Sequence, residues 1–212
     1  MSSIQAADPA TIIAGFPHPV VTKIIGRPTF SQIQKLNKQL KANAASVPTT
    51  LGGGLLGHLG LLLTPAEYAT VTNAHFMFPV NPGLSAEVPL TSTAAQTGHL
   101  VRTHQALKRT YDTCVNVETA LKQQIIHAVE NAFISALENE HTGFNAVTAK
   151  QIIDHLFTTC GQISNEAMED NDKTFKKQFD IDEPIENLWM RVKNCVQFAE
   201  HGQAPYSAEQ IL

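Results

Sequence analysis

The feature that most constrains the fold is the helical spacing of apolar residues in the second half of the chain. From about Ala94 to Leu212, apolar side chains recur at steps of three and four positions, the repeat that places them on one face of an α-helix. The first such stripe contains Leu100, His104, Leu107, Tyr111 and Cys114. The pattern predicts an all-α fold.

Capping boxes mark where several helices begin. In such a box, a Thr or Ser oxygen accepts an unpaired amide of the first turn, and a Gln or Glu side chain returns to the amide of the capping residue. The pattern occurs at Thr29–Gln32, Thr64–Glu67, Thr148–Gln151 and Ser207–Gln210. The last box opens an apolar stripe directly before the sequence stops, which suggests that the natural polypeptide, or its ancestor, continues.

Caps, prolines and glycines together give the expected boundaries of the helices. The first half is predicted to hold helices over residues 30–45 and 65–73, followed by a long loop over residues 76–93. In the second half, Asn116 offers a cap that divides the stripe begun at Leu100 from a second stripe reaching Leu137. Further helices are predicted over residues 149–160, after Ser164, and from Pro184 to Gly202.

The amino-terminal residues 1–28 are rich in proline and small side chains, and we predict an extended arm there. Val20–Val21 and Ile24–Ile25 are candidates for a short strand within it.

A glycine-rich stretch at residues 51–57 lacks the residues of a phosphate site. A phosphate loop ends in Gly-Lys-Ser/Thr, and no lysine stands within reach of these glycines. A dinucleotide site requires a preceding strand within a βαβ unit, and no such unit is visible. We interpret the stretch as a turn before a short apolar helix, in which Gly57 and Gly60 permit close packing.

Composition is that of an ordinary globular protein, with 43% apolar and 16% charged residues. The longest apolar run, Leu59–Leu63, is far shorter than a membrane span, and the amino terminus lacks the pattern of a signal peptide. We therefore expect a cytoplasmic protein without a membrane partner. Three widely separated cysteines, Cys114, Cys160 and Cys195, fit buried positions on helix stripes rather than disulfides or a zinc site.

The net charge of −4 is unevenly distributed. Residues 1–106 carry six Lys/Arg against three Asp/Glu, and residues 107–212 carry nine against sixteen. Neither half has the clustered cations that bind phosphate backbones, and the acidic run from Glu166 to Glu183 repels them.

No motif indicates catalysis. The chain has nine histidines but neither HExxH nor Gly-x-Ser-x-Gly, and the spacing of His99 and His104 turns them to different helix faces. We interpret His104 as a hydrogen-bonded core or interface residue, and Glu138 and Glu140 as solvated. We predict no catalytic residue, no cofactor site and no metal ligand. An enzyme whose site is assembled from distant loops stays an open alternative.

Three stretches resemble the Gag polypeptides of copia-type LTR retrotransposons, particularly those of diatoms and related microbial eukaryotes. They are ANAASVPTTLGGGLLGHLGLLLTPAEYA followed by NPG, then ALKQQIIHAVENAF with TGFNAVTAKQIIDHLFTTCGQIS, and finally EPIENLWMRVKNCVQFAEHGQAPYSAEQIL. The resemblance covers nearly the whole chain after about residue 17. The single motifs are only moderately specific to this family, and the order in which they occur along the chain is the stronger support for the resemblance.

The resemblance implies a capsid protein whose copies assemble into a virus-like particle around the RNA of the element. It implies a helical amino-terminal domain at residues 29–162 and the start of a smaller helical carboxyl-terminal domain at residues 163–212, with the junction near Ile163. Related Gag proteins often carry a C-x2-C-x4-H-x4-C zinc knuckle, which this chain lacks. Any RNA contact is therefore expected to be indirect or to require segments beyond this chain.

A second hypothesis is a Gag-derived protein that binds a protein or peptide partner, for which an apolar groove in the 30–73 region would be the sign. Trp189 is the only tryptophan, and its helix stripe favours a core position over an interface position. A shell protein requires rigid helices whose remaining apolar faces meet other copies, so both functions are consistent with the absence of catalytic motifs.

Overall fold

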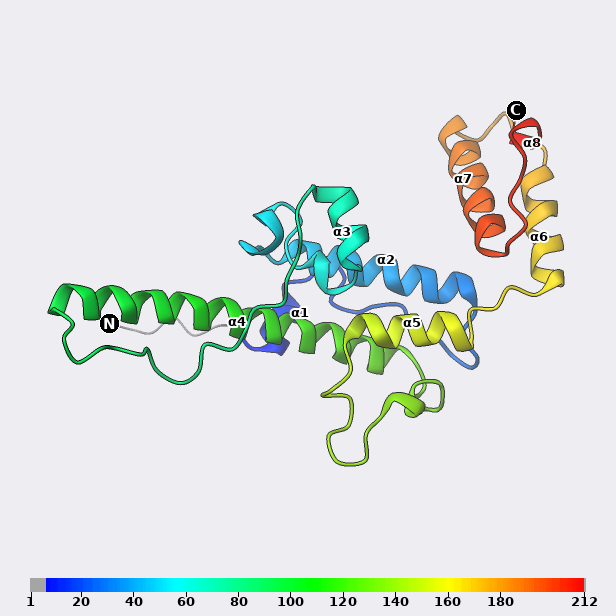
Figure 1. Cartoon of the computed structure of the whole chain (residues 1–212). Helices are drawn as coiled ribbons and strands as arrows, with labels where there is room; N and C mark the ends of the chain where they lie inside the picture. The colour runs from blue at the N-terminus through cyan, green and yellow to red at the C-terminus, as the bar shows by residue number, and fades with distance from the viewer. Residues whose placement is uncertain (1–6, 212) are drawn as a thin grey trace. The chain divides into compact units, whose positions relative to one another are not determined.

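The computed structural model describes residues 7–211, and in this part of the chain the regular secondary structure is helical apart from one isolated bridge between Asn139 and Gly143 (Figure 1). The prediction of an all-α fold is confirmed. The helices are α1 (Pro9–Ala14), α2 (Phe30–Ser46), α3 (Pro65–Thr72), α4 (Ala94–Ala128), α5 (Ala149–Thr159), α6 (Asn165–Lys176), α7 (Ile185–His201) and α8 (Ala208–Ile211). Short 3-10 turns are η1 (Leu51–Gly54), η2 (Leu59–Leu61), η3 (Asn131–Phe133) and η4 (Ser135–Leu137).

The chain divides into two compact units, the first ending at Cys160 and the second beginning at Gly161. The first unit contains α1 to α5 and the second contains α6 to α8. The assignment of residues 29–162 and 163–212 to two capsid-like domains stays a prediction.

The core of the first unit forms where α2, α5 and the carboxyl-terminal half of α4 pack together. Each helix contributes apolar residues at helical spacing that are removed from solvent, and burial of each such side chain stabilises the fold by roughly 1.5–3 kcal/mol. These residues are Ile33, Leu36 and Leu40 on α2, Val117, Leu121 and Ile125 on α4, and Ile152 and Leu156 on α5. The rings of Phe30 and Phe157, 5.5 Å apart between centroids, extend the contact of α2 with α5.

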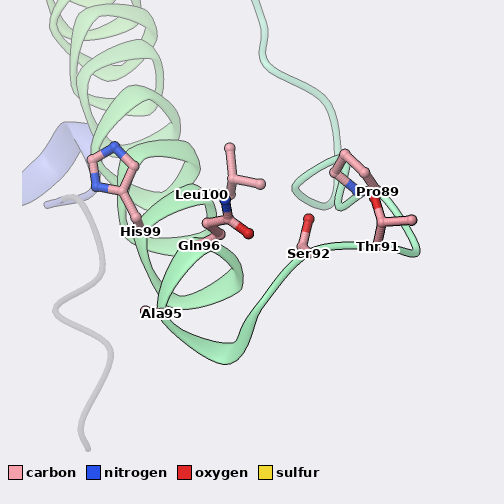
Figure 2. Close-up of a pocket in the computed structure, with 7 residues that line it drawn as sticks. All are labelled: Pro89, Thr91, Ser92, Ala95, Gln96, His99 and Leu100. Carbon is pink, nitrogen blue, oxygen red and sulfur yellow. The ribbon is translucent and has the colours of Figure 1, made fainter.

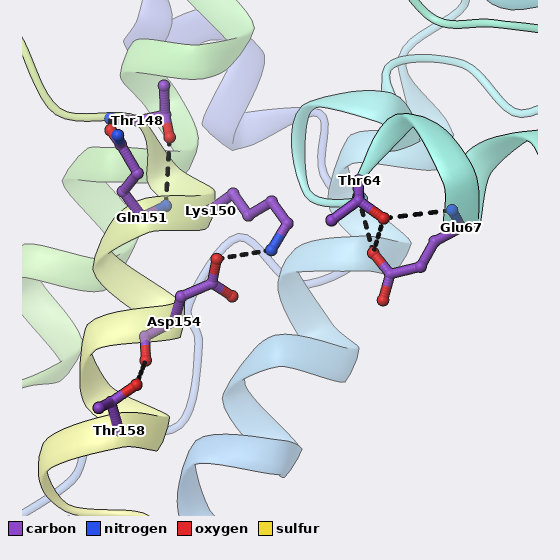
Figure 3. Close-up of polar contacts among 7 residues, drawn as sticks. All are labelled: Thr64, Glu67, Thr148, Lys150, Gln151, Asp154 and Thr158. Atoms are coloured by element: carbon purple, nitrogen blue, oxygen red, sulfur yellow. Dashed lines mark hydrogen bonds and ion pairs between the residues drawn. The ribbon is translucent and has the colours of Figure 1, made fainter.

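Side-chain caps fix the helix starts as the sequence predicts. At α3, the Glu67 amide donates to Thr64 Oγ1 over 3.2 Å, and the Thr64 amide donates to Glu67 over 2.7 Å (Figure 3). Thr148 and Gln151 form the same reciprocal pair at α5, as do Thr29 and Gln32 at α2. Sequence reasoning missed a further box, formed by Thr93 and Gln96, which opens α4. At α8, the Gln210 side chain accepts the Ser207 amide over 2.8 Å.

A buried carboxylate joins α4 to α5. Glu118 Oε1 accepts the amide of Ala149, the first residue of α5, over 2.6 Å. This bond satisfies a donor at a helix amino terminus, where the helix dipole favours negative charge. Burial nevertheless raises the pKa of Glu118, with the Ala149 bond and Lys122 opposing the rise. Burial beside Glu118 also raises the pKa of the Cys114 thiol to about 12, so this cysteine is a protonated core residue.

The predicted extended arm is wrong over residues 9–14, which form α1, capped by Asp8. The helix buries Ile12 and contacts α4, and the following residues bury Phe16, Val21 and Ile24 in the core. Because these apolar side chains reach the core, the segment is part of the packed unit. Residues 15–28 form no strand, and residues 1–6 of the predicted arm lie outside the described part.

The predicted division at Asn116 is also wrong, because α4 continues unbroken from Ala94 to Ala128. The Asn116 side chain does not cap a helix; it donates to the Ala7 carbonyl over 2.9 Å. The helix then ends earlier than predicted, since the Ala128 carbonyl accepts the Ile24 amide over 2.7 Å and Val129 adopts an extended conformation. The expected helix through Leu137 is replaced by η3 and η4.

The glycine-rich stretch packs tightly, as predicted. A side chain at Gly57 would collide with the carbonyls of Ala45 and Val47, and one at Gly60 would collide with the Phe76 ring. Between them His58 is buried, with Nδ1 2.8 Å from the Val47 carbonyl oxygen. The glycines therefore let the chain around η2 lie directly against the end of α2.

The second unit has a much smaller core than the first. The described residues buried in it are Cys195 and Ala199, both on α7, and α6 contributes none. Asn171 on α6 donates to the Cys195 carbonyl over 3.1 Å and to the Tyr206 hydroxyl over 3.2 Å. Phe175 stacks on Tyr206 with ring centroids 4.2 Å apart. Polar bonds and one aromatic stack thus hold α6 and the end of the chain to α7.

The buried Glu118 predicts a specific dependence of stability on pH. A raised pKa means that the folded chain holds the Glu118 proton more tightly than the unfolded chain does. The stability linked to this group is complete below the ordinary pKa of glutamate, about 4.3, and is lost as pH rises through the higher folded pKa. The Glu118→Gln variant keeps an acceptor oxygen for the Ala149 amide. Because glutamine does not ionise, the variant does not lose this stability as pH rises.

Urea unfolding of the first unit at several pH values between about 4 and 7 measures the effect. The free energy of unfolding of E118Q, relative to wild type, is expected to rise with pH, by about 1.4 kcal/mol for each unit that separates the folded and unfolded pKa values. A difference that stays constant over this range would contradict the account.

Candidate interaction surfaces

Within residues 7–211, titratable side chains do not gather into a metal-binding cluster. In that part of the chain, no group of three or more His, Cys, Asp or Glu residues lies close enough to hold a metal ion. Cys114, Cys160 and Cys195 are buried free thiols, which confirms their predicted core positions. Glu138 and Glu140 are exposed, as predicted.

The amino terminus of α4 borders an open hollow of about 640 Å³ (Figure 2). The hollow contains one imidazole, His99, and two hydroxyls, Thr91 and Ser92. No hydrogen bond of the described chain joins His99 to either hydroxyl. A hydroxyl nucleophile is usually activated by a base within hydrogen-bonding distance, and His99 forms no such pair here. The remaining lining residues are Pro89, Ala95, Gln96 and Leu100.

A second hollow of about 630 Å³ lies in the second unit, along residues 177–183. Its one side chain from α7, Arg191, donates through Nη2 to the Lys177 carbonyl over 2.6 Å. The guanidinium therefore holds the connection between α6 and α7 in place.

Exposed apolar side chains are numerous in residues 77–113, which we call the α4 projection. It consists of the loop after Phe76 and the first twenty residues of α4, and none of its residues is buried. At 1.5 Å per residue, this part of α4 extends about 30 Å beyond the packed core of its unit (Figure 1). Its exposed apolar side chains are Met77, Phe78, Val80, Leu84, Val88, Leu90, Val101 and Leu107, with Leu84 100% exposed.

Ring packing connects the loop of the projection to its helix. Phe78 meets Tyr111 edge to face, with ring centroids 6.3 Å apart. The helical part carries Arg102, Lys108 and Arg109 and no acidic residue before Asp112, which pairs with Lys108 over 2.6 Å. The helical part of the projection thus combines exposed apolar side chains with positively charged ones. Isolated exposed apolar residues are common, whereas the number on this projection makes it a candidate interaction surface.

The second unit has an exposed apolar surface of its own, formed by Ile181, Ile185, Trp189 and Met190, which we call the α7 face. Ile185 and Trp189 stand four positions apart and therefore lie on one side of α7. Trp189 is 66% exposed, so its predicted core position is wrong. The buried residues of α7 are Cys195 and Ala199, nearer the carboxyl end of the helix.

The sequence-based reading of His104 is also corrected. The residue lies half-buried on the α4 projection, outside the core. Its Nε2 atom is shielded from solvent and has no hydrogen-bond partner within residues 7–211. The predicted core position is therefore wrong, and the alternative of an interface position stays a prediction.

No family model, no curated protein and no solved structure matches this chain. Within residues 7–211, no helix is both long enough and apolar enough to cross a membrane, although α4 has 35 residues. The two surfaces therefore have to be interpreted from their own chemistry.

The exposure of Trp189 predicts how its fluorescence responds to a quencher. Because Trp189 is the only tryptophan, its emission reports the α7 face alone. In dilute solution, we expect iodide to quench it nearly as efficiently as a free tryptophan derivative. Quenching several times weaker, with the chain monomeric at the same dilution, would place Trp189 in a core and contradict the α7 face.

Proposed function

We propose that this chain is a structural Gag-type capsid protein of a retrotransposon, whose copies assemble into a virus-like particle enclosing the RNA of the element. The observation that carries the proposal is that each of the two compact units exposes an apolar surface of its own, the α4 projection in one and the α7 face in the other. A lattice requires at least two distinct contact surfaces per subunit, whereas a simple dimer requires one.

The residues of both surfaces support a role in protein contact. Aromatic and methionine side chains are enriched where proteins bind each other, and both surfaces contain them: Met77 and Phe78 on the projection, Trp189 and Met190 on the α7 face. Individually weak contacts are sufficient in a shell, because many of them form at once and raise the effective concentration of the next. The resemblance to copia-type Gag sequences points to the same function.

The proposal is for a structural protein in the cytoplasm rather than an enzyme, with other copies of the chain as its principal partner. RNA would be enclosed without a dedicated site on this chain. In support, the second unit is acidic overall, and its ion pairs, such as Lys173 with Asp170 and Lys176 with Asp172, engage two of its lysines.

Sedimentation velocity over a range of protein and salt concentrations tests self-assembly. We expect wild type to shift to larger species as concentration rises. The double variant W189A/M190A is expected to require at least tenfold more protein, since removal of two interface anchors costs about 1.4 kcal/mol or more. Its fold should persist, because both side chains are exposed.

Leu55→Ala is the matched control, because Leu55 is exposed, apolar and outside both surfaces. It is expected to assemble like wild type. A wild-type chain that stays monomeric at the highest concentration would contradict the proposed function. Equal effects of L55A and W189A/M190A would contradict the role of the α7 face.

A further inference from the structure

Residues 7–26, which we call the amino-terminal segment, lie against α2 and α4 of the first unit (Figure 1), and we call the surface of α2 and α4 that they cover the groove. Four apolar side chains of the segment are buried there: Ile12, Phe16, Val21 and Ile24. They follow one another at irregular spacing through a short helix and an extended stretch, so they enter the groove as separate anchors. A helix as short as α1 is not stable alone, so the groove holds it in shape.

Two buried amides at the centre of the groove bind the main chain of the segment. Asn43 on α2 accepts the His18 amide over 2.8 Å and donates to the His18 carbonyl over 2.9 Å. Gln124 on α4 donates to the carbonyls of His18 and Pro19 over 2.9 and 3.1 Å. Asn43 also donates to Gln124 over 2.9 Å. Both amides are almost fully buried, so without the segment they would lose their partners in an apolar site.

Further groups of the groove bind the segment in the same way along its length. The Thr22 amide donates to Gln39 over 2.9 Å, and the Gly26 amide donates to Glu130 over 2.8 Å. These bonds end on backbone atoms, which every residue offers. The groove therefore has the chemistry of an extended-peptide site, in which the main chain supplies hydrogen bonds and the apolar anchors select the sequence.

A short hinge is the only covalent link between the segment and α2. It is centred on residues 25–27, in which Ile25 and Arg27 are exposed and Gly26 has a φ of 71° with open space around it. A change of backbone direction at Gly26 breaks its bond to Glu130 but moves no buried side chain of residues 25–27. The groove makes the same bonds and buries the same anchors whether the segment belongs to its own chain or to another copy.

We propose that the groove between α2 and α4 accepts the amino-terminal segment of a second copy, so that neighbouring subunits of an assembly exchange residues 7–26. This inference rests on the proposed self-assembly and names a contact within it. Exchange of an identical element is a low-cost way to join subunits, because no new interface has to be created, and a short hinge favours it. In a dilute monomer, each segment occupies its own groove.

Crosslinking between two cysteine variants of the full chain tests the exchange. Thr22→Cys places a thiol on the segment, and Gln39→Cys places one on α2 beside it. The native cysteines are buried and react slowly. The two variants, one carrying a size tag, are mixed, assembled and treated with a short bismaleimide. We expect a mixed T22C–Q39C product in assembled material, and an internal crosslink in the dilute double variant T22C/Q39C.

Two controls make the result specific to the groove. T22C mixed with Leu55→Cys, an exposed thiol elsewhere on the unit, should give at least tenfold less mixed product. Insertion of Gly-Ser-Gly-Ser between Arg27 and Pro28 should reduce the mixed T22C–Q39C product at least threefold, because a longer hinge favours binding of a chain's own segment.

The possible outcomes separate the two proposals. Assembled material with internal crosslinks only would overturn the exchange and leave the proposed shell function standing. A chain that does not assemble at any concentration would overturn the shell function, and the exchange with it. A mixed product as abundant with L55C as with Q39C would show random proximity and would also overturn the exchange.

Discussion

The structure of the first unit depends on α4 being buried over its carboxyl-terminal turns only. From Cys114 to Ala128 its apolar stripe meets α2, α5 and the amino-terminal segment. Three polar groups of this half also form hydrogen bonds. Glu118 accepts the Ala149 amide at the start of α5, Gln124 donates to the His18 carbonyl of the segment, and the Ala128 carbonyl accepts the Ile24 amide. Because these partners lie on this half, residues 94–113 of α4 bury no side chain, and the same helix provides both part of the core and an exposed surface.

Local signals in the sequence predicted most of the fold. The caps at Thr29, Thr64, Thr148 and Ser164 gave correct helix starts, because a cap acts within one turn of backbone. Errors arose where distant contacts decide the outcome. Asn116 is a good cap by type, but its side chain binds Ala7, and nothing in the sequence indicates that pairing. Similarly, the arm predicted for residues 1–28 contains apolar anchors whose groove exists only in the folded unit.

The interaction surfaces were harder to predict than the core, since a stripe shows which side of a helix is apolar but not what covers it. Trp189 and Leu107 both occupy regular helical positions, and both are exposed because the units contain too few helices to cover every stripe. For an isolated soluble chain this excess of apolar surface would favour aggregation. For a subunit of a shell, the same surfaces are contacts between copies.

Electron microscopy of the full chain at increasing concentration tests the central claim most directly, because it distinguishes an ordered shell from other kinds of association. The account predicts closed particles of uniform size that appear above a threshold concentration and dissociate on dilution. Discrete monomers or dimers throughout, or amorphous aggregates of uneven size, would contradict it.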